Sequence, residues 1–227
     1  MARPRRTNAT RVLSALVLLP CLAGPAHGQD DWTLVTEEDG VEVSQRPVPG
    51  RSLPVLRGIG VVEANLFRVL AVIRDVERHT EWVHDCSESR LLGIEGEAVA
   101  YAYNRSDAPW PVSDRDVVVR TETLVLEAGI EVEVRFRSVE HDSQDEVDGV
   151  VRMPRLRGHY RLRVLEAGRT QVEYQVDADP GGRLPAWLVR RTARDIPLQT
   201  LVNLRRQVTK TRGEYTDSVR RSELQSP

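Results

Sequence analysis

Residues 179–188 read DPGGRLPAWL, and this short stretch separates two patterns of different period. Before it, residues 170–178 have the composition of a strand, which the run Pro180-Gly181-Gly182 ends. After it, apolar residues recur at three- and four-residue spacing from Leu184 to about Arg212, which predicts a helix. The chain therefore passes from sheet to one long C-terminal helix at this point.

The predicted C-terminal helix has one broad face that holds most of its apolar side chains. Pro197 lies inside it, and because proline lacks an amide donor and clashes with the preceding turn, we expect a kink near residues 193–196. The residues that can share the broad face are Leu184, Trp187, Leu188, Leu198, Leu201, Val202, Arg205 and Val208.

Strand signals dominate the chain before this helix. Residues 32–35, 41–44 and 53–62 come first, and Asn65 then opens a helical pattern that is followed by a short helix or turn over 76–84. Residues 130–137 alternate strictly between apolar and charged side chains, so one face of that strand is buried and the other is wet. The other expected strands are 88–92, 97–103, 116–126, 130–139, 147–153, 158–166 and 170–178, with turns at Gly93, Gly96, Gly129 and Gly168.

Consecutive short strands followed by helix predict the α+β class, with an antiparallel meander and helices gathered at one face or end of the sheet. The chain has 227 residues, of which 40% are hydrophobic and 29% are charged, an ordinary globular balance. Its formal net charge of −2 provides no general basic field, so we expect no nucleic-acid partner.

The first 28 residues have the pattern of a signal peptide. Four arginines without an acid precede a mostly apolar run over 12–23, which is too short to span a bilayer, and Ala26-His27-Gly28 offers a cleavage site. We therefore expect export to the periplasm or medium. Lipidation of Cys21 is an alternative that the preceding Pro20 disfavours. Cleavage would leave Cys86 as a single cysteine, without an intramolecular disulfide.

No catalytic or metal-binding grouping is evident in the sequence. His79 and His84 are five residues apart and do not share a helical face, and a Cys86–His84 pair lacks a third orienting group. There is also no glycine-rich phosphate loop or G-x-S-x-G motif. We therefore expect no metal, no cofactor and no catalytic residue.

Residues 106–119 read SDAPWPVSDRDVVV, in which Pro109-Trp110-Pro111 precedes a predicted buried strand. If that strand has begun, Arg115 and Asp116 point to opposite faces, and Val117 or Val118 faces the interior according to register. An inward Arg115 needs a carboxylate or an anionic ligand, since an unpaired buried arginine is costly. Alternatively, Asp114 and Arg115 close a turn at the surface.

Four stretches together resemble the START domain family. They are Trp32 with residues 39–43 (DGVEV), Glu81-Trp82, the PWP and DRD residues of 109–116, and residues 179–188. The resemblance runs from Trp32 to about Thr211 and implies a helix-grip fold, in which a curved antiparallel sheet wraps around a long C-terminal helix. It also implies a cavity between them, a START-like lipid-binding domain over 29–215 and a flexible tail over 216–227.

The resemblance implies a set of ligand-binding candidates, for each of which plain core packing is the alternative. His159 and Tyr160 point to opposite faces of one strand, and we favour Tyr160 as the inward residue. Residues 158–160 (GHY) stand where many relatives have tryptophan, which leaves the ligand class open. The candidates are Trp82, Tyr101, Tyr103, Trp110, Arg115, Tyr160, Trp187, Leu188 and Leu201.

A lipid pocket needs apolar area and a few placed polar groups, without a nucleophile or metal. The expected function is therefore non-catalytic binding, with transfer, of a sterol, phospholipid, fatty acyl chain or other apolar molecule. The basic C-terminal helix suggests transient contact with a membrane surface, or else a solvated face. There are two alternatives. One is an aromatase/cyclase-like enzyme, which is favoured if Arg115, Tyr103 or His159 converge on the ligand. The other is an interaction module with a collapsed cavity.

Overall fold

The computed structural model describes residues 31–216, which lie in the compact unit 31–227. The predicted signal peptide, including Cys21, and residues 217–227 of the predicted tail lie outside the described residues. Within them the chain forms a ten-stranded sheet, two α-helices and one 3₁₀ helix. The elements are β1 (Thr33–Glu38), β2 (Val41–Arg46), β3 (Val55–Val62), α1 (Leu66–Arg74), η1 (Val76–Glu81), β4 (Cys86–Glu95), β5 (Val99–Ser106), β6 (Arg115–Glu127), β7 (Glu131–Ser138), β8 (Val151–Arg152), β9 (Arg155–Glu166), β10 (Arg169–Asp179) and α2 (Ala186–Lys210).

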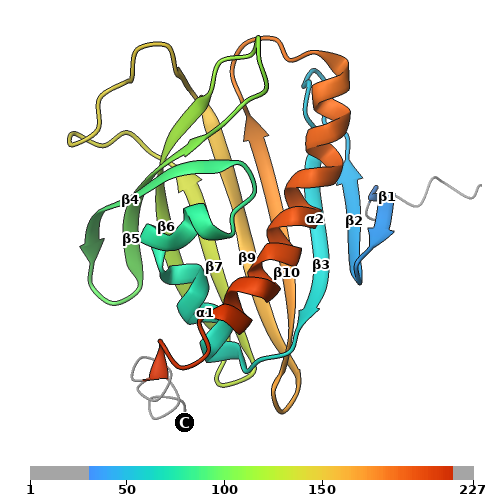
Figure 1. The fold of residues 1–227 in the computed structure, drawn as a ribbon, viewed down its shortest axis with the longest axis vertical. Coiled ribbons are helices and arrows are strands. Elements are labelled where there is room, and N and C mark those ends of the chain that lie inside the picture. The colour runs from blue at the N-terminus through green and yellow to red at the C-terminus, as the bar shows by residue number, and fades with distance from the viewer. Residues whose placement is uncertain (1–30, 217–227) are drawn as a thin grey trace, which may run out of the picture. The chain divides into compact units, whose positions relative to one another are not determined.

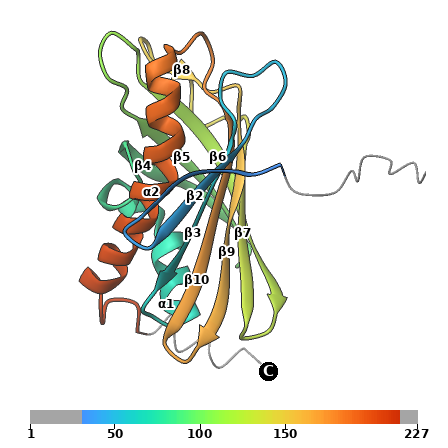
Figure 2. The same ribbon diagram turned by 90° about the vertical axis from the view of Figure 1, so that its right-hand side faces the viewer.

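The strand order is β1-β2-β3-β10-β9-β7-β6-β5-β4, so the third strand pairs with the last. Helices α1 and α2 lie on one side of β3, β10, β9 and β7 (Figure 2). We call the face of the sheet toward these helices the inner face and the opposite one the outer face. This arrangement confirms the α+β class and the helix-grip fold with its long C-terminal helix.

Two sequence predictions about strands were wrong. The strand expected over 147–153 is only Val151–Arg152, because Gly149 turns the chain with a φ of 77° just before it. That short β8 pairs with β6 in parallel, so the sheet is not a pure antiparallel meander. Gly93 is not a turn residue: it lies inside β4, at a register shift against β5.

Helix α2 begins two residues later than predicted, with Pro185 at its N-cap position, and ends at Lys210. It continues through Pro197 as one helix, and Figure 1 shows it changing direction along its length, as the proline predicts. The shorter α1 begins after Asn65, whose side chain accepts a hydrogen bond of 2.9 Å from the amide of Arg68. No helix in the described part of the chain is long and apolar enough to cross a membrane.

The core lies between the inner face and the two helices. A side chain at Gly58 of β3 would come within 2.9 Å of Pro197 Cβ and 3.1 Å of the Leu201 side chain. The absence of a side chain there lets the middle of α2 approach the sheet backbone. The fully buried Leu198, Leu201 and Leu204 then pack in this core.

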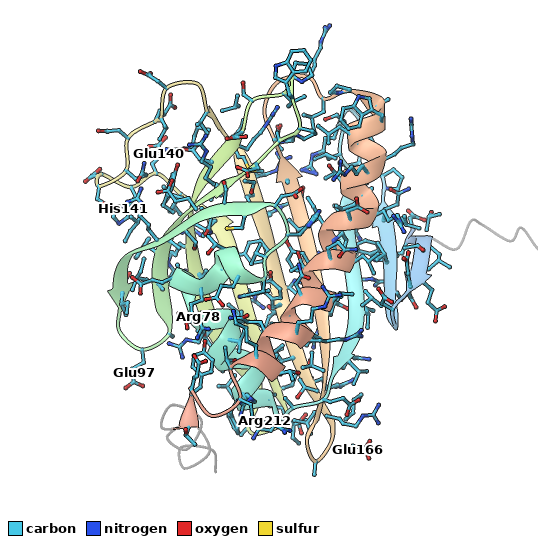
Figure 3. The ribbon with its side chains drawn as sticks, in the orientation of Figure 1. Arg78, Glu97, Glu140, His141, Glu166 and Arg212 are labelled. Carbon is cyan, nitrogen blue, oxygen red and sulfur yellow. The ribbon has the colours of Figure 1, made fainter. Side chains whose placement is uncertain are left out.

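The C-terminal half of α2 is tied to the fold by several hydrogen bonds. Arg205, predicted on the apolar face, donates to the carbonyl oxygens of Val61 and Gly40, both at 2.7 Å. Lys210 forms an ion pair of 2.6 Å with Glu81 of η1. Arg78, which also pairs with Glu81, is labelled beside this region in Figure 3.

Candidate functional site

A cavity of about 190 Å³ lies between the inner face and the N-terminal half of α2. Its walls come from β3, β6, β7, β9 and β10, and α2 closes it through Thr192, Ile196 and Thr200. Val119 on β6 and Phe136 on β7 are among its side chains, and most of the lining is apolar. The alternation of the strands produces this lining, since every second residue of each strand faces inward.

Two tyrosines provide the largest polar side chains of the cavity. Tyr160 and Tyr174 lie opposite each other on β9 and β10, and their rings stack with centroids 4.6 Å apart. Burial raises the pKa of both phenols, so both remain protonated at neutral pH. They can therefore donate hydrogen bonds within a mostly apolar space.

Two other titratable groups of the cavity, His79 and Cys86, have a pKa shifted by burial toward the neutral form. His79 donates from Nε2 to the carbonyl oxygen of Ile73 at 2.9 Å, and burial lowers its pKa below the ordinary value. Burial raises the pKa of the Cys86 thiol to about 11. Because a thiol nucleophile needs a lowered pKa, Cys86 is not activated for covalent chemistry.

A second pocket, of about 210 Å³, adjoins the cavity and shares His84, Thr192 and Ile196 with it. We call it the vestibule. It lies between the β5–β6 loop and the first turns of α2, and Leu188 lines it. Its polar side chains include Asp107 and the pair Arg191–Asp195, which are 3.3 Å apart. The apolar cavity therefore adjoins a more polar space.

Two of the nine predicted ligand-binding residues line the pockets, and two more are buried in the core between the sheet and the helices. Tyr160 lines the cavity, and Leu188 lines the vestibule. Trp82 is buried and contacts Tyr160 edge-on with ring centroids 6.0 Å apart, and its Nε1 is buried without a partner among the described residues. Leu201 is buried against Gly58 and is a packing residue, not a wall of the cavity.

Tyr101 and Tyr103 do not face the cavity, which corrects that prediction. Strand β5 turns Asn104 and Ser106 inward, so the residues of odd number point to the other side. Tyr101 packs against His141, which is labelled in Figure 3 on the loop between β7 and β8, with ring centroids 5.3 Å apart. Tyr103 is buried under Arg90, whose guanidinium lies 4.7 Å from the ring centroid.

Trp110 and Trp187 do not line the cavity either, because Trp110 is 90% exposed and Trp187 is 44% exposed. Arg115 begins β6 and lies within hydrogen-bonding distance of the carbonyl oxygens of Pro180 and Gly181, at 3.3 and 3.5 Å. It therefore joins the segments 106–119 and 179–188 to each other instead of entering the cavity. Asp114, also in that segment, accepts hydrogen bonds from Arg105 and from the amide of Ala108, as a turn-closing residue does.

Sequence reasoning missed several residues of the cavity wall. Tyr174 and Phe136 both lie in stretches that were predicted as strands, opposite Tyr160 and Gly158 of β9 respectively. Once Tyr160 is taken as inward, the pairing of β9 with its two neighbours makes both residues inward. The missing information was which strands are neighbours, and local alternation does not contain it.

The fold and the apolar cavity define a helix-grip binding protein. The START domain sequence model matches residues 21–212, and the chain belongs to the START domain family. It is 36% identical over 196 residues to an uncharacterized protein of Pseudomonas aeruginosa, covering 86% of this chain and 96% of that one. A crystal structure of a STAR-related lipid transfer protein from Xanthomonas axonopodis is similar with 34% identity and a TM-score of 0.71, over 79% of this chain and 99% of that one. The rat phosphatidylcholine transfer protein is 24% identical over 177 residues, which are 77% of this chain and 82% of that one.

Proposed function

We propose that this protein binds one lipid in the cavity under α2, with the polar end of the lipid toward the vestibule, and carries it between membranes. The observation that carries the proposal is the cavity itself, which is walled by apolar side chains and holds two protonated tyrosines. Such a space favours an apolar ligand with few hydrogen-bonding groups. Similarity to lipid transfer proteins supports the same reading.

The volume of the cavity limits how the lipid enters. At about 190 Å³ it is smaller than the roughly 300–1,000 Å³ of typical ligand pockets, so a whole lipid needs a wider space. Arg205 and Lys210 tie down the C-terminal half of α2, whereas Thr192 and Ile196 of the N-terminal half separate the cavity from the vestibule. We therefore propose that the N-terminal half moves outward to admit the ligand.

Native mass spectrometry of the protein purified from its own host tests the binding proposal. We expect a co-purifying lipid that is lost in Val119→Trp, because the indole would fill the cavity. Val125→Trp on the same strand is the matched control, since Val125 is 67% exposed and does not line the cavity. Absence of lipid from the unaltered protein, or equal loss in both variants, would reject the proposal.

The alternative of an aromatase/cyclase-like enzyme required Arg115, Tyr103 or His159 to converge on the ligand. Arg115 lies against backbone carbonyl groups, and Tyr103 is buried under Arg90. His159 pairs with Glu173 on the outer face at 2.9 Å. Because these three residues are absent from the cavity wall, the enzyme alternative is not favoured.

Contact with a membrane is the second part of the proposal, and we place it at the N-terminal end of α2. Several basic residues farther along the helix are already paired, including Arg194 with Glu38 at 2.6 Å. The exposed Trp110 and Trp187 lie in segments that Arg115 joins, and Figure 1 shows the β5–β6 loop and the start of α2 at the same end of the sheet. Exposed tryptophans suit a membrane interface.

Tryptophan fluorescence with anionic vesicles tests the membrane contact. We expect a blue shift that is lost in the double variant Trp110→Ala, Trp187→Ala, whereas Leu165→Ala at an exposed hairpin on another part of the sheet keeps it. If the double variant still showed the blue shift, the membrane contact would lie on another part of the protein. Export is a further proposal, and N-terminal sequencing of the protein from its host would support it by finding a start near Gln29.

A further inference from the structure

A groove of about 400 Å³ lies on the outer face, separate from the proposed lipid cavity. Gly158 is one of its lining residues, and the groove crosses β6, β7, β9 and β10. The charged and imidazole side chains that line it are Arg46, Arg120, Arg135, Arg137, Arg157, His159, Glu122 and Asp177. Five arginines therefore face two carboxylates, and the groove has an excess of positive charge.

The register of the sheet places three of these arginines side by side. Arg120 of β6 is directly opposite Arg137 of β7, and Arg137 is directly opposite Arg157 of β9. Like charges that are directly opposite on neighbouring strands destabilise a sheet. A neighbouring row of the outer face avoids this arrangement, because Glu133, Arg161 and Glu173 alternate in sign across β7, β9 and β10.

The carboxylates near this row pair with Arg120 and Arg157 but leave the guanidinium of Arg137 without a partner among the described residues. Asp177 is buried and accepts hydrogen bonds from both Arg51 and Arg157, at 2.5 and 2.9 Å. The Nε of Arg155 lies 3.9 Å from the same carboxylate, and its Nε and Nη2 atoms are buried without a hydrogen-bond partner among the described residues. One carboxylate thus serves three guanidinium groups.

Arg137, in the centre of the row, is exposed, and its side chain makes no hydrogen bond or ion pair within residues 31–216. Its neighbour Arg120 is paired with Glu122 at 2.8 Å, and Arg135, which is 59% exposed, is paired with Glu133. Neighbouring strands are about 4.8 Å apart, so the row of three arginines spans roughly 10 Å. Guanidinium groups at this spacing can bind the oxygens of adjacent phosphate groups in a bidentate manner.

From the row of arginines and the open groove, we infer that the outer face binds a phosphate-bearing molecule through Arg120, Arg137 and Arg157. The inference goes beyond lipid binding in the cavity, since the two sites lie on opposite faces of the same strands. The phosphate can belong to a soluble anion or to a lipid headgroup. The two sources share the chemistry and are distinguished by separate arms of the test.

Calorimetric titration of the purified protein with inorganic pyrophosphate, at low and constant ionic strength, tests the inference. We expect saturable one-to-one binding that weakens about tenfold in Arg137→Gln. Arg163→Gln is the matched control, because Arg163 is another exposed arginine on the outer face but pairs with Glu131 at 3.5 Å. Its affinity should stay within about twofold of the unaltered protein.

A melting experiment on the same variants shows whether lost binding reflects lost folding. Removing one of three adjacent like charges should leave the melting temperature of Arg137→Gln unchanged or raised. If that variant does not fold, Arg135→Gln tests the same groove. No saturable binding of pyrophosphate, or equal weakening by Arg137→Gln and Arg163→Gln, would overturn the inference.

Vesicle co-sedimentation separates the two sources of phosphate. If the protein bound phosphatidylglycerol vesicles in a way that Arg137→Gln abolished and that added pyrophosphate inhibited by competition, that result would assign the groove to lipid headgroups. Pyrophosphate binding that needs Arg137, with vesicle binding that does not, would assign it to a soluble phosphate compound. In the second case Trp110→Ala should still weaken vesicle binding. The proposal of membrane contact through Trp110 is therefore tested separately from the proposal of phosphate binding in the groove.

Discussion

The two faces of the sheet carry different chemistry on the same strands. Strand β6 turns Val119 and Thr121 toward the cavity and turns Arg120 and Glu122 toward the outer groove. The inner face keeps Asp, Glu, Arg and Lys side chains out of the cavity wall, and burial shifts the pKa of His79 and of Cys86 toward the neutral form. The outer face has three adjacent arginines in one row, whereas other arginines of this face lie opposite acidic residues. Alternation alone thus produces two adjacent sites with opposite ligand preferences.

Gly158 lies in β9 at the outer groove, and replacing it should have the largest effect on stability. A Cβ atom there would meet the carbonyl oxygen of Gln175 at 2.0 Å and the ring of Phe136 at 2.6 Å. Because the first contact is with backbone, Gly158→Val should destabilise the fold by about 3 kcal/mol or more. Chemical denaturation measures this, and a loss below about 1 kcal/mol would show that the strands can separate there.

The buried ion pair between Asp116 and Arg152 should rank second. Asp116 is 1% exposed and accepts hydrogen bonds from Arg152 at 2.8 and 3.1 Å. Asp116→Asn should cost about 2 kcal/mol, less than for a fully buried pair, since Arg152 can turn toward water. The exposed Asp142→Asn is the control and should change the unfolding free energy by less than about 0.5 kcal/mol. If Asp116→Asn and Asp142→Asn changed the unfolding free energy equally, the Asp116 carboxylate would affect stability only through the net charge of the protein.

The pH dependence of stability should come partly from the inner face. Burial lowers the pKa of His79 in the folded state, an effect that its hydrogen bond to Ile73 and the charge of Asp75 only partly oppose. The unfolded chain therefore binds a proton first as the pH falls below about 6.5, and stability is lost in that range. Denaturation at pH 7.5 and pH 5 should show a smaller difference for His79→Gln than for the unaltered protein, and an unchanged difference would contradict this.

The outer face should show the smallest effect on folding. Arg137→Gln should leave the unfolding free energy within about 0.5 kcal/mol of the unaltered protein while weakening phosphate binding about tenfold. Varying the salt concentration sharpens the contrast: phosphate binding should weaken as salt screens the arginines, and the retention of lipid in the cavity should not. Salt-sensitive lipid retention would mean that charge also holds the ligand of the inner face.

The sequence by itself determined the elements whose signal is local. The break at Pro180-Gly181-Gly182 and the long helix after it follow from residue type and period. The family followed from four short stretches, two of which Arg115 brings together in the structure. These features depend on neighbouring residues in the chain, so one sequence contains them.

Only the tertiary structure decided which strands are neighbours and which face each residue meets. The pairing of β3 with β10 brings Gly58 beneath Pro197, and no local pattern contains that contact. The outward positions of Tyr101 and Tyr103, and the row of Arg120, Arg137 and Arg157, depend on cross-strand register in the same way. Alternation specifies two faces but not which of them is buried, because burial depends on the distant segments that pack against the strand.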